Sequence, residues 1–293
     1  MIKQLEAYLK MGRPWQYLKN GFVWIPLLFG YQLSNPKAVA LTTAAFIAFC
    51  LMASCIYIMN DLADIQEDRR HPVKRHRPLA SGAVRPGEAA WLALLLFGAA
   101  VAIAFIALPI SFVYVLIAYF FLNAAYSQGL KRIPILDIVC IAVGFVLRII
   151  AGCIAAHVAS SPWVMMMAFL LALFLALAKR RDDILLADQG HRIRRKAIGG
   201  YNLEFISLAM GIMASVIIVA YIMYTVSPAV VAKHGTNYLY MTGIWVLLGL
   251  LRYLQITFVD GKSGSPTHVL MKDYPLQAVI AGWLINIYVL LYR

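Results

Sequence analysis

The residues best suited to chemistry in this sequence are four polar side chains that follow a long apolar run: Asn60, Asp61, Asp64 and Asp68. If this segment is helical, a rotation of about 100° per residue places the three carboxylates within an arc of roughly 60°. Carboxylates gathered on one stripe repel each other unless a cation lies between them. Because the ligands are oxygens and no cysteine is close, a hard cation such as Mg²⁺ fits better than Zn²⁺. Asp61, Asp64 and Asp68 are therefore the predicted metal ligands.

A run of cations follows these carboxylates and leads into the sequence PLASG. Lys74, Arg75 and Arg77 suit phosphate oxygens, since Arg binds as a planar fork and Lys as a point charge. A metal site beside phosphate-binding cations predicts a polyphosphate substrate held as its Mg²⁺ complex. The alternative is a solvated hairpin in which the carboxylates pair with the arginines.

The composition places these residues beside a lipid bilayer. Hydrophobic residues make up 62% of the 293 residues, charged residues make up 13%, and the mean hydropathy is +0.77. These values are typical of an integral membrane protein. The net charge of +13 would suggest a nucleic-acid partner in a soluble protein. Here the basic residues cluster in alternate loops, so membrane topology and phosphate ligands explain the charge, and no nucleic-acid partner is expected.

Apolar segments of helix-spanning length predict an all-α integral membrane protein with about nine transmembrane helices around a central polar chamber. The expected spans are 14–34, 38–59, 88–107, 110–127, 135–155, 162–181, 203–225, 237–258 and 274–292. Lys and Arg gather at the N-terminus and after every second span. The positive-inside rule therefore places the N-terminus and the mouth of the chamber on the cytoplasmic side of an inner membrane. We expect one domain over 1–293, with a short helix at 1–12 and active-site loops at 60–88 and 179–202.

Further polar residues lie at the ends of these spans or within them. Such side chains are costly to place in lipid and usually face a cavity. The additional substrate-binding candidates are Arg13, Gln16, Lys19, Tyr126, Ser127, Lys131, Arg148, Lys179 and Arg180. A buried structural ion pair is the alternative role for Arg148, and a topology signal is the alternative role for the basic end of the sixth span. The sequence does not indicate the roles of Asp182 and Asp183.

Several motifs resemble those of the UbiA-type intramembrane prenyltransferase superfamily, and the resemblance covers nearly the whole chain. The pattern NDxxDxxxD at 60–68 is similar to an Asp-rich motif found across that superfamily. RPWQYLKN at 13–20, HPVKRHRP at 71–78 and GSPTHVLMKDYPL at 264–276 most resemble its decaprenyl-phosphate phosphoribosyltransferases. The chain departs from the aromatic prenyltransferases at 179–181, where KRR takes the place of a second Asp-rich motif. This departure favours a substrate with more anionic phosphates to neutralise.

The resemblance implies Mg²⁺-dependent transfer of 5-phosphoribose from phosphoribosyl pyrophosphate to a polyprenyl phosphate, for synthesis of a cell-envelope precursor. Mg²⁺ on Asp61 and Asp64, together with Asp68, would stabilise the departing pyrophosphate as a Lewis acid. Asn60 would orient a carboxylate or bind the metal directly. Lys74 and the neighbouring arginines would bind phosphate oxygens as preorganised cations. The expected catalytic residues are thus Asn60, Asp61, Asp64 and Lys74, and a homo-oligomer is left open.

Two other functions fit parts of the pattern. A prenyltransferase that joins a polyprenyl diphosphate to an aromatic or other small acceptor would also use Mg²⁺ to stabilise the departing pyrophosphate. The two reactions differ in which compound carries the pyrophosphate. A carrier for an anionic metabolite or a lipid would suit the polar residues within the helices, but it has no need of three carboxylates arranged for Mg²⁺.

Overall fold

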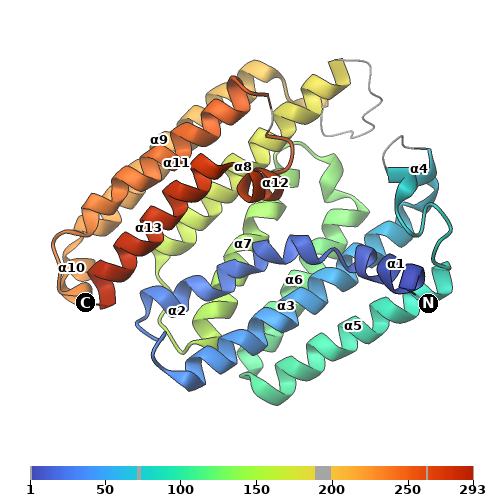
Figure 1. Ribbon diagram of the computed structural model, residues 1–293, viewed down its shortest axis with the longest axis horizontal. Helices are drawn as coiled ribbons and strands as arrows, with labels where there is room; N and C mark the ends of the chain where they lie inside the picture. Colours follow the sequence, from blue (N-terminus) through green and yellow to red (C-terminus); the bar gives the residue numbers. More distant parts are fainter. Residues whose placement is uncertain (1, 71–73, 189–198, 262, 293) are drawn as a thin grey trace. The chain divides into compact units, whose positions relative to one another are not determined.

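The structure is a computed structural model that describes residues 2–70, 74–188, 199–261 and 263–292. In these ranges all regular secondary structure is helical (Figure 1). The chain divides into two compact units, which are described separately below. Unit 1 comprises residues 1–128 and 147–159, and unit 2 comprises residues 129–146 and 160–293. That the chain works as one domain stays a prediction.

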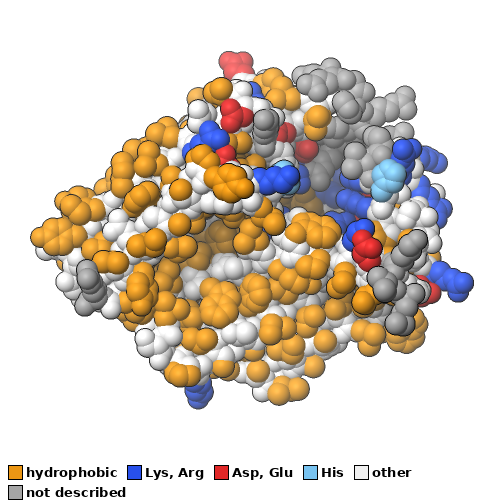
Figure 2. Space-filling view, viewed as in Figure 1, with side chains coloured by type: hydrophobic (Ala, Val, Ile, Leu, Met, Phe, Trp, Pro, Cys, Tyr) orange, Lys and Arg blue, Asp and Glu red, His pale blue; other side chains and the backbone are white. Residues whose placement is uncertain are grey.

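Eight helices in the described ranges are long and apolar enough to cross a membrane. They are α3 (Pro36–Ala63), α5 (Pro86–Ala107), α6 (Ile110–Gln128), α7 (Leu136–Ala155), α8 (Pro162–Asp188), α9 (Leu203–Val226), η5 (Leu239–Thr242) with α11 (Gly243–Phe258), and α13 (Tyr274–Tyr292). Large apolar side chains such as Trp91, Tyr114 and Leu208 are about two-thirds exposed, and hydrophobic side chains cover most of the surface in view (Figure 2). Extensive exposed apolar surface on long apolar helices is the signature of contact with lipid. The chain is a multi-pass membrane protein.

The segment expected as the first span, 14–34, differs from the other eight. It forms the 3₁₀ helix η1 (Pro14–Trp24) followed by the short α2 (Ile25–Phe29). A 3₁₀ helix has three residues per turn, so residues three apart lie in one row along it. Gln16 and Lys19 therefore share one side of η1.

Unit 1 contains α1 (Ile2–Gly12), η1, α2, α3, α4 (Ile65–Arg69), η2 (Lys74–His76), α5, α6 and the last part of α7. The side chain of Asn35 caps α3 by accepting hydrogen bonds from the first backbone N–H groups of the helix. Aromatic packing joins α3 to α6, because the ring of Phe49 meets the ring of Phe112 at 5.9 Å and that of Tyr119 at 5.1 Å between centroids. The core thereby fixes α3, which carries Asn60 and Asp61.

The helical stripe expected for Asp61, Asp64 and Asp68 is interrupted. Helix α3 ends at Ala63, Asp64 lies between the helices with φ −98° and ψ 9°, and α4 begins at Ile65. A uniform rotation per residue therefore does not apply across this segment, and the predicted arc does not describe it. Asp61 belongs to α3 and Asp68 to α4.

Unit 2 contains η3 (Leu130–Arg132), the first part of α7, α8, α9, α10 (Pro228–His234), η5, α11, α12 (Pro266–Lys272) and α13. The Asn202 side chain caps α9 by accepting from the N–H of Phe205 at 2.7 Å. Within the core, Phe174 of α8 meets Tyr253 of α11 edge to face at 5.6 Å between centroids. This packing holds the end of α8 that carries Lys179 and Arg180.

Candidate functional site

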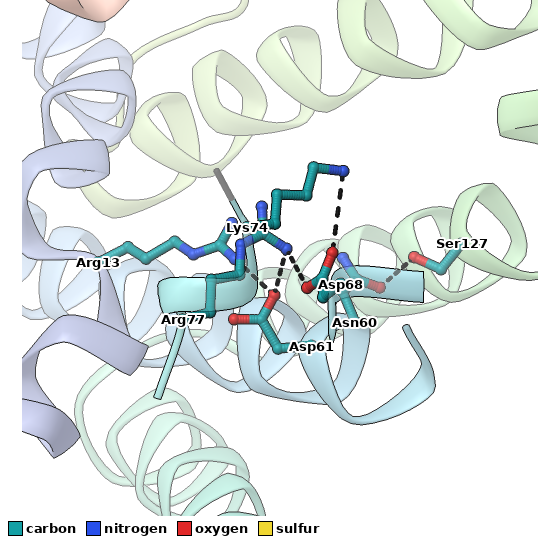
Figure 3. Close-up of polar contacts among 7 residues, drawn as sticks. All are labelled: Arg13, Asn60, Asp61, Asp68, Lys74, Arg77 and Ser127. Carbon is teal, nitrogen blue, oxygen red and sulfur yellow. Dashed lines mark hydrogen bonds and ion pairs between the residues drawn. The ribbon is translucent and has the colours of Figure 1, made fainter. Parts of the chain in front are cut away.

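Two buried carboxylates in unit 1 converge on one guanidinium nitrogen. Asp61 and Asp68 are only 3% and 2% exposed. The Nη1 atom of Arg77 donates to Oδ1 of Asp61 at 3.0 Å and to Oδ2 of Asp68 at 2.7 Å (Figure 3). Charge-assisted hydrogen bonds of this length are among the strongest in proteins. A positive charge thus lies between the two carboxylates, where their mutual repulsion requires one.

A second arginine reaches Asp61 from η1. Nη2 of Arg13 donates to the same Oδ1 atom of Asp61 at 2.5 Å, and the Arg13 guanidinium lies 5.0 Å from the centre of the Tyr57 ring. Arg13 itself has a left-handed backbone conformation, with φ 53° and ψ 58°, immediately before Pro14. This conformation is uncommon for a residue with a side chain. The turn ends α1 and starts η1, and its Arg13 side chain reaches the carboxylate.

Two further contacts complete this cluster. Nζ of Lys74 lies 3.9 Å from Oδ1 of Asp68. The hydroxyl of Ser127, near the end of α6, donates to Oδ1 of Asn60 and also to the Asn123 carbonyl at 2.8 Å. Figure 3 shows the Arg13, Lys74 and Arg77 side chains directed at the two carboxylates. The structure therefore brings seven of the predicted site residues together, and these seven are called the carboxylate cluster below: Arg13, Asn60, Asp61, Asp68, Lys74, Arg77 and Ser127.

The donor chemistry of this cluster fits a hard divalent cation. The described residues include no group of three or more His, Cys, Asp or Glu side chains that could hold a metal ion. Asp61 and Asp68 nevertheless direct two carboxylate oxygens at one cationic atom, and carboxylates are preferred ligands of Mg²⁺. The solvated hairpin, the alternative for this loop, shares the carboxylate–arginine pairing. It differs in burial, because both carboxylates here are removed from solvent.

Arg148 lies in unit 1 and is held by neutral groups. It is 5% exposed, its Nε donates to Oδ1 of Asn20 at 2.8 Å, and its Nη2 donates to the Tyr119 hydroxyl at 2.8 Å. The guanidinium also lies 4.7 Å from the centre of the Tyr119 ring, close enough for a cation–π interaction. These contacts tie the last part of α7 to η1 and α6. Binding of substrate by Arg148 stays a prediction.

In unit 2, Arg180 is buried in an ion-pair network. Its Nε donates to Oδ2 of Asp137 at 2.6 Å and its Nη1 donates to Oδ2 of Asp183 at 2.9 Å, while Arg180 and Asp137 are at most 1% exposed. The Tyr201 hydroxyl donates to Oδ1 of Asp137 at 2.6 Å and accepts from the N–H of Ile135. Burial, and then the hydrogen bond to Asp137, raise the pKa of Tyr201, so its proton stays in place. Arg180 thus joins α8 to α7.

Arg181 contacts the last turn of α11, and Asp182 contacts the segment that follows it. The hydroxyl of the fully buried Ser263 donates to Oδ1 of Asp182 at 2.9 Å, and Nη1 of Arg181 donates to the Thr257 carbonyl at 2.7 Å. The neighbouring Gly264 packs so closely that a Cβ atom there would lie 2.9 Å from Oδ2 of Asp182. The structure therefore assigns Asp182, whose role the sequence left open, to fastening this loop onto α8.

The remaining predicted residues are half-buried or exposed within their units. Four of them are half-buried in unit 1: Gln16, Lys19, Asp64 and Tyr126. Arg75 is exposed in the same unit, with its Nε 3.3 Å from Nε2 of His76. Two are half-buried in unit 2, namely Lys131 and Lys179. Sequence reasoning missed Tyr119, Tyr201 and Ser263. Each contacts a residue at least 29 positions away, so no local pattern marks it.

Comparison with known proteins places the chain in a family. A model of the UbiA prenyltransferase family matches residues 23–272. A decaprenyl-phosphate phosphoribosyltransferase from Corynebacterium glutamicum is 30% identical over 98% of this chain and 87% of that protein. A protein of the same name from Mycolicibacterium smegmatis is 31% identical over 96% of this chain and 91% of that protein. The fold matches a UbiA homolog from Archaeoglobus fulgidus bound to GPP and Mg²⁺, with a TM-score of 0.73, 17% identity and coverage of 98% of this chain and 100% of that one.

Proposed function

This chain is a membrane-embedded transferase of the UbiA prenyltransferase family, and we propose that it transfers 5-phosphoribose from phosphoribosyl pyrophosphate to a polyprenyl phosphate. The bond from the ribose C1 to the pyrophosphate oxygen breaks, and pyrophosphate leaves with the electron pair. A new bond forms between C1 and an oxygen of the lipid phosphate. Mg²⁺ is the proposed cofactor.

The observation that carries this proposal is the likeness to proteins named decaprenyl-phosphate phosphoribosyltransferase. It extends over 96% or more of this chain at about 30% identity in two separate relatives. The sequence pattern HPVKRHRP at 71–78, which contains Lys74 and Arg77, resembles the same group of enzymes. The charge of the carboxylate cluster agrees, since three cations contact two carboxylates there.

The chain's own residues suit this reaction. Negative charge develops on the departing pyrophosphate as the C1–O bond breaks, and preorganised cations stabilise it. Arg13, Lys74 and Arg77 are the cations that the cluster offers. Bound Mg²⁺, held by Asp61 and Asp68, would supply Lewis-acid stabilisation of the same leaving group. The lipid phosphate is already an anion, so the attack on C1 requires no strong general base.

The distribution of Lys and Arg supports a cytoplasmic position for this chemistry. Loops rich in these residues face the cytoplasm in multi-pass membrane proteins, and the loop after α3 carries six of them between Arg69 and Arg85. Figure 2 shows Lys and Arg side chains gathered over the part of unit 1 that contains α4. We therefore place the carboxylate cluster at the cytoplasmic face of the membrane.

The decisive experiment compares two pairs of substrates on the purified protein in detergent with Mg²⁺. One reaction contains labelled phosphoribosyl pyrophosphate and a polyprenyl phosphate, and the other contains a polyprenyl diphosphate and an aromatic acid. We expect label to enter the lipid in the first reaction only and to be lost when a chelator is added. Product in the second reaction only would refute the proposal and favour a prenyl transfer.

A matched pair of variants tests the cluster within that assay. Asp61→Asn should abolish phosphoribosyl transfer, because it removes a charged oxygen that contacts both Arg13 and Arg77. Glu6→Gln is the control, since Glu6 pairs with Lys10 on the exposed side of α1 and should leave turnover unchanged. Full Mg²⁺-dependent activity in Asp61→Asn would show that the metal is held elsewhere.

A further inference from the structure

The carboxylate cluster is already neutralised by side chains of the protein itself. Arg77 bridges Asp61 and Asp68 through one nitrogen atom, and its side chain is 29% exposed while those of the two carboxylates are 4% and 3% exposed. Of these three side chains, Arg77 is thus the most exposed. It can turn outward while the carboxylates stay in place.

A divalent cation that used both carboxylates would compete with this guanidinium. Oδ1 of Asp61 and Oδ2 of Asp68 are the oxygens that Arg77 occupies, at 3.0 and 2.7 Å. Oδ1 of Asp61 also accepts from Arg13. An oxygen that already accepts charged hydrogen bonds is a poorer ligand for a cation, so a metal that binds these two oxygens displaces Arg77 from at least one carboxylate.

The balance of charge shows when such an exchange is favourable. Two carboxylates and the three cations Arg13, Lys74 and Arg77 already leave a net positive charge in the cluster. A divalent cation alone would add two further positive charges and would meet like-charge repulsion. A polyphosphate that binds together with the metal supplies negative charge that offsets these positive charges. Its oxygens also accept hydrogen bonds from the displaced Arg77 guanidinium, which binds them as a planar fork.

We propose that Arg77 holds the cation position between Asp61 and Asp68 in the ligand-free enzyme and couples metal binding to pyrophosphate binding. The metal takes the carboxylates only as Arg77 transfers its hydrogen bonds to phosphate oxygens. Metal and polyphosphate then each strengthen the binding of the other by the same factor, as linkage requires. This inference deepens the proposed function, because it concerns how the cluster takes up a polyphosphate substrate.

The test measures metal binding directly and needs no turnover. Mn²⁺ serves as the probe, and free Mn²⁺ is counted by electron paramagnetic resonance with the purified protein in detergent. Without any phosphate ligand, Arg77→Gln should bind Mn²⁺ about tenfold more tightly than the unaltered protein, since one competing charge within a few ångströms of the site is removed. Weaker or unchanged Mn²⁺ binding by Arg77→Gln would overturn the proposal.

A matched control separates the specific exchange from a general effect of charge. Arg70 is an exposed arginine at the end of α4, and Arg70→Gln removes the same charge from the same loop. It should change Mn²⁺ affinity less than twofold. Arg77→Lys keeps the charge but replaces the planar fork by a point charge, and it should bind Mn²⁺ with nearly the affinity of the unaltered protein. If Arg70→Gln and Arg77→Gln gained Mn²⁺ affinity equally, net charge alone would explain the effect. That result would refute the proposal that Arg77 occupies the metal position.

Inorganic pyrophosphate tests the coupling itself. In the unaltered protein, saturating pyrophosphate should tighten Mn²⁺ binding about tenfold or more, after correction for Mn²⁺–pyrophosphate in solution, and this factor should shrink in Arg77→Gln. An undiminished factor in Arg77→Gln would exclude Arg77 as the coupling residue.

Folding is monitored in parallel by the thermal unfolding midpoint. Arg77→Gln should unfold at a lower temperature than the unaltered protein without metal, because its two carboxylates then repel each other, and Mn²⁺ should raise its midpoint by the larger amount. A midpoint that Mn²⁺ leaves unchanged in Arg77→Gln would contradict the exchange. These readouts do not depend on the acceptor lipid, so they can succeed even if phosphoribosyl transfer is absent, and the two proposals fail separately.

Discussion

Replacing Gly152 by alanine tests how η1 is held in unit 1. An added Cβ atom would lie 2.1 Å from the Val23 carbonyl oxygen, 2.9 Å from its carbon and 3.1 Å from Cδ of Pro26. Ordinary contacts of a Cβ atom begin at about 3.4 Å, and the closest of these atoms belong to the backbone, which cannot rotate away. We therefore expect Gly152→Ala to push η1 away from α7. Arg148, one helical turn before Gly152, binds Asn20 of the same 3₁₀ helix.

The size of the effect follows from two opposing terms. Overfilling a well-packed interior costs about 1–3 kcal/mol, whereas alanine in place of glycine in a helix stabilises it by about 1 kcal/mol. Because the added Cβ would meet a backbone atom at 2.1 Å, the cost of overfilling lies in the upper part of that range. The net destabilisation is then about 1–2 kcal/mol, which lowers the unfolding midpoint by about 2–3 °C in a chain of this size. Because η1 begins beside Arg13, which contacts Asp61, the Michaelis constant for the phosphorylated donor should also rise.

Thermal unfolding in detergent, followed by tryptophan fluorescence, measures this change. Gly98→Ala is the matched control, since Gly98 also lies in a helix of unit 1 and nothing is within 4 Å of its added Cβ. That variant should unfold at the midpoint of the unaltered protein or slightly above it. If Gly152→Ala is as stable as Gly98→Ala, then η1 and α7 do not pack as closely as described, and the reasoning fails.

Three further predictions concern unit 2. Arg180→Met should destabilise the protein by about 3–5 kcal/mol, because Asp137 would be left as a buried carboxylate without its guanidinium partner. Adding Asp137→Asn should recover most of that stability, as measured by thermal unfolding. If Arg180 served only to bind substrate, Arg180→Met would change donor affinity and leave stability unaltered. Gly264→Ala should lower the unfolding midpoint, since its Cβ would lie 2.9 Å from Oδ2 of Asp182. Asp182→Ser shortens that side chain, so adding it to Gly264→Ala should relieve the effect. An equal loss of midpoint in Gly264→Ala and in the double variant would contradict the contact. Burial, and then Lys233, lower the pKa of His234 from 6.5 to about 4. As the pH drops, His234 is therefore protonated in the unfolded chain before it is protonated in the folded protein. The free energy of unfolding is expected to fall by at most about 3 kcal/mol between about pH 6.5 and pH 4. If His234→Gln loses stability over this pH range as the unaltered protein does, His234 is not the cause.

The positions of the membrane helices were largely predictable from local sequence. Eight of the nine expected spans correspond to helices that are long and apolar enough to cross a bilayer. A helix satisfies its own backbone hydrogen bonds, so apolar length alone marks a transmembrane segment in most cases. The segment at 14–34 escaped this rule, because it forms the 3₁₀ helix η1, in which Asn20 accepts a hydrogen bond from Arg148 of α7 and Val23 packs against Gly152 of α7.

The sequence by itself determined the inventory of charged groups and indicated that they belong to a membrane protein. It placed the carboxylates of Asp61 and Asp68 beside Lys74 and Arg77 in one loop, and this proximity is a local property of the chain. Only the tertiary structure decided which charges meet. The break at Asp64 separates the carboxylates into two helices, and α3 brings Asp61 to an arginine 48 residues away.

The same distinction explains the two buried arginines. Sequence reasoning names both Arg148 and Arg180 as substrate-binding candidates, with a structural ion pair as the alternative for Arg148 and a topology signal as the alternative for Arg180. In the structure, Arg148 is held by Asn20 and Tyr119, and Arg180 is held by Asp137. A buried cation is stable only with partners that replace its water, and those partners come from segments distant in sequence. The local sequence shows that such a residue is costly to bury. Only the packing of the helices determines which groups replace the hydrogen bonds that its guanidinium would make with water.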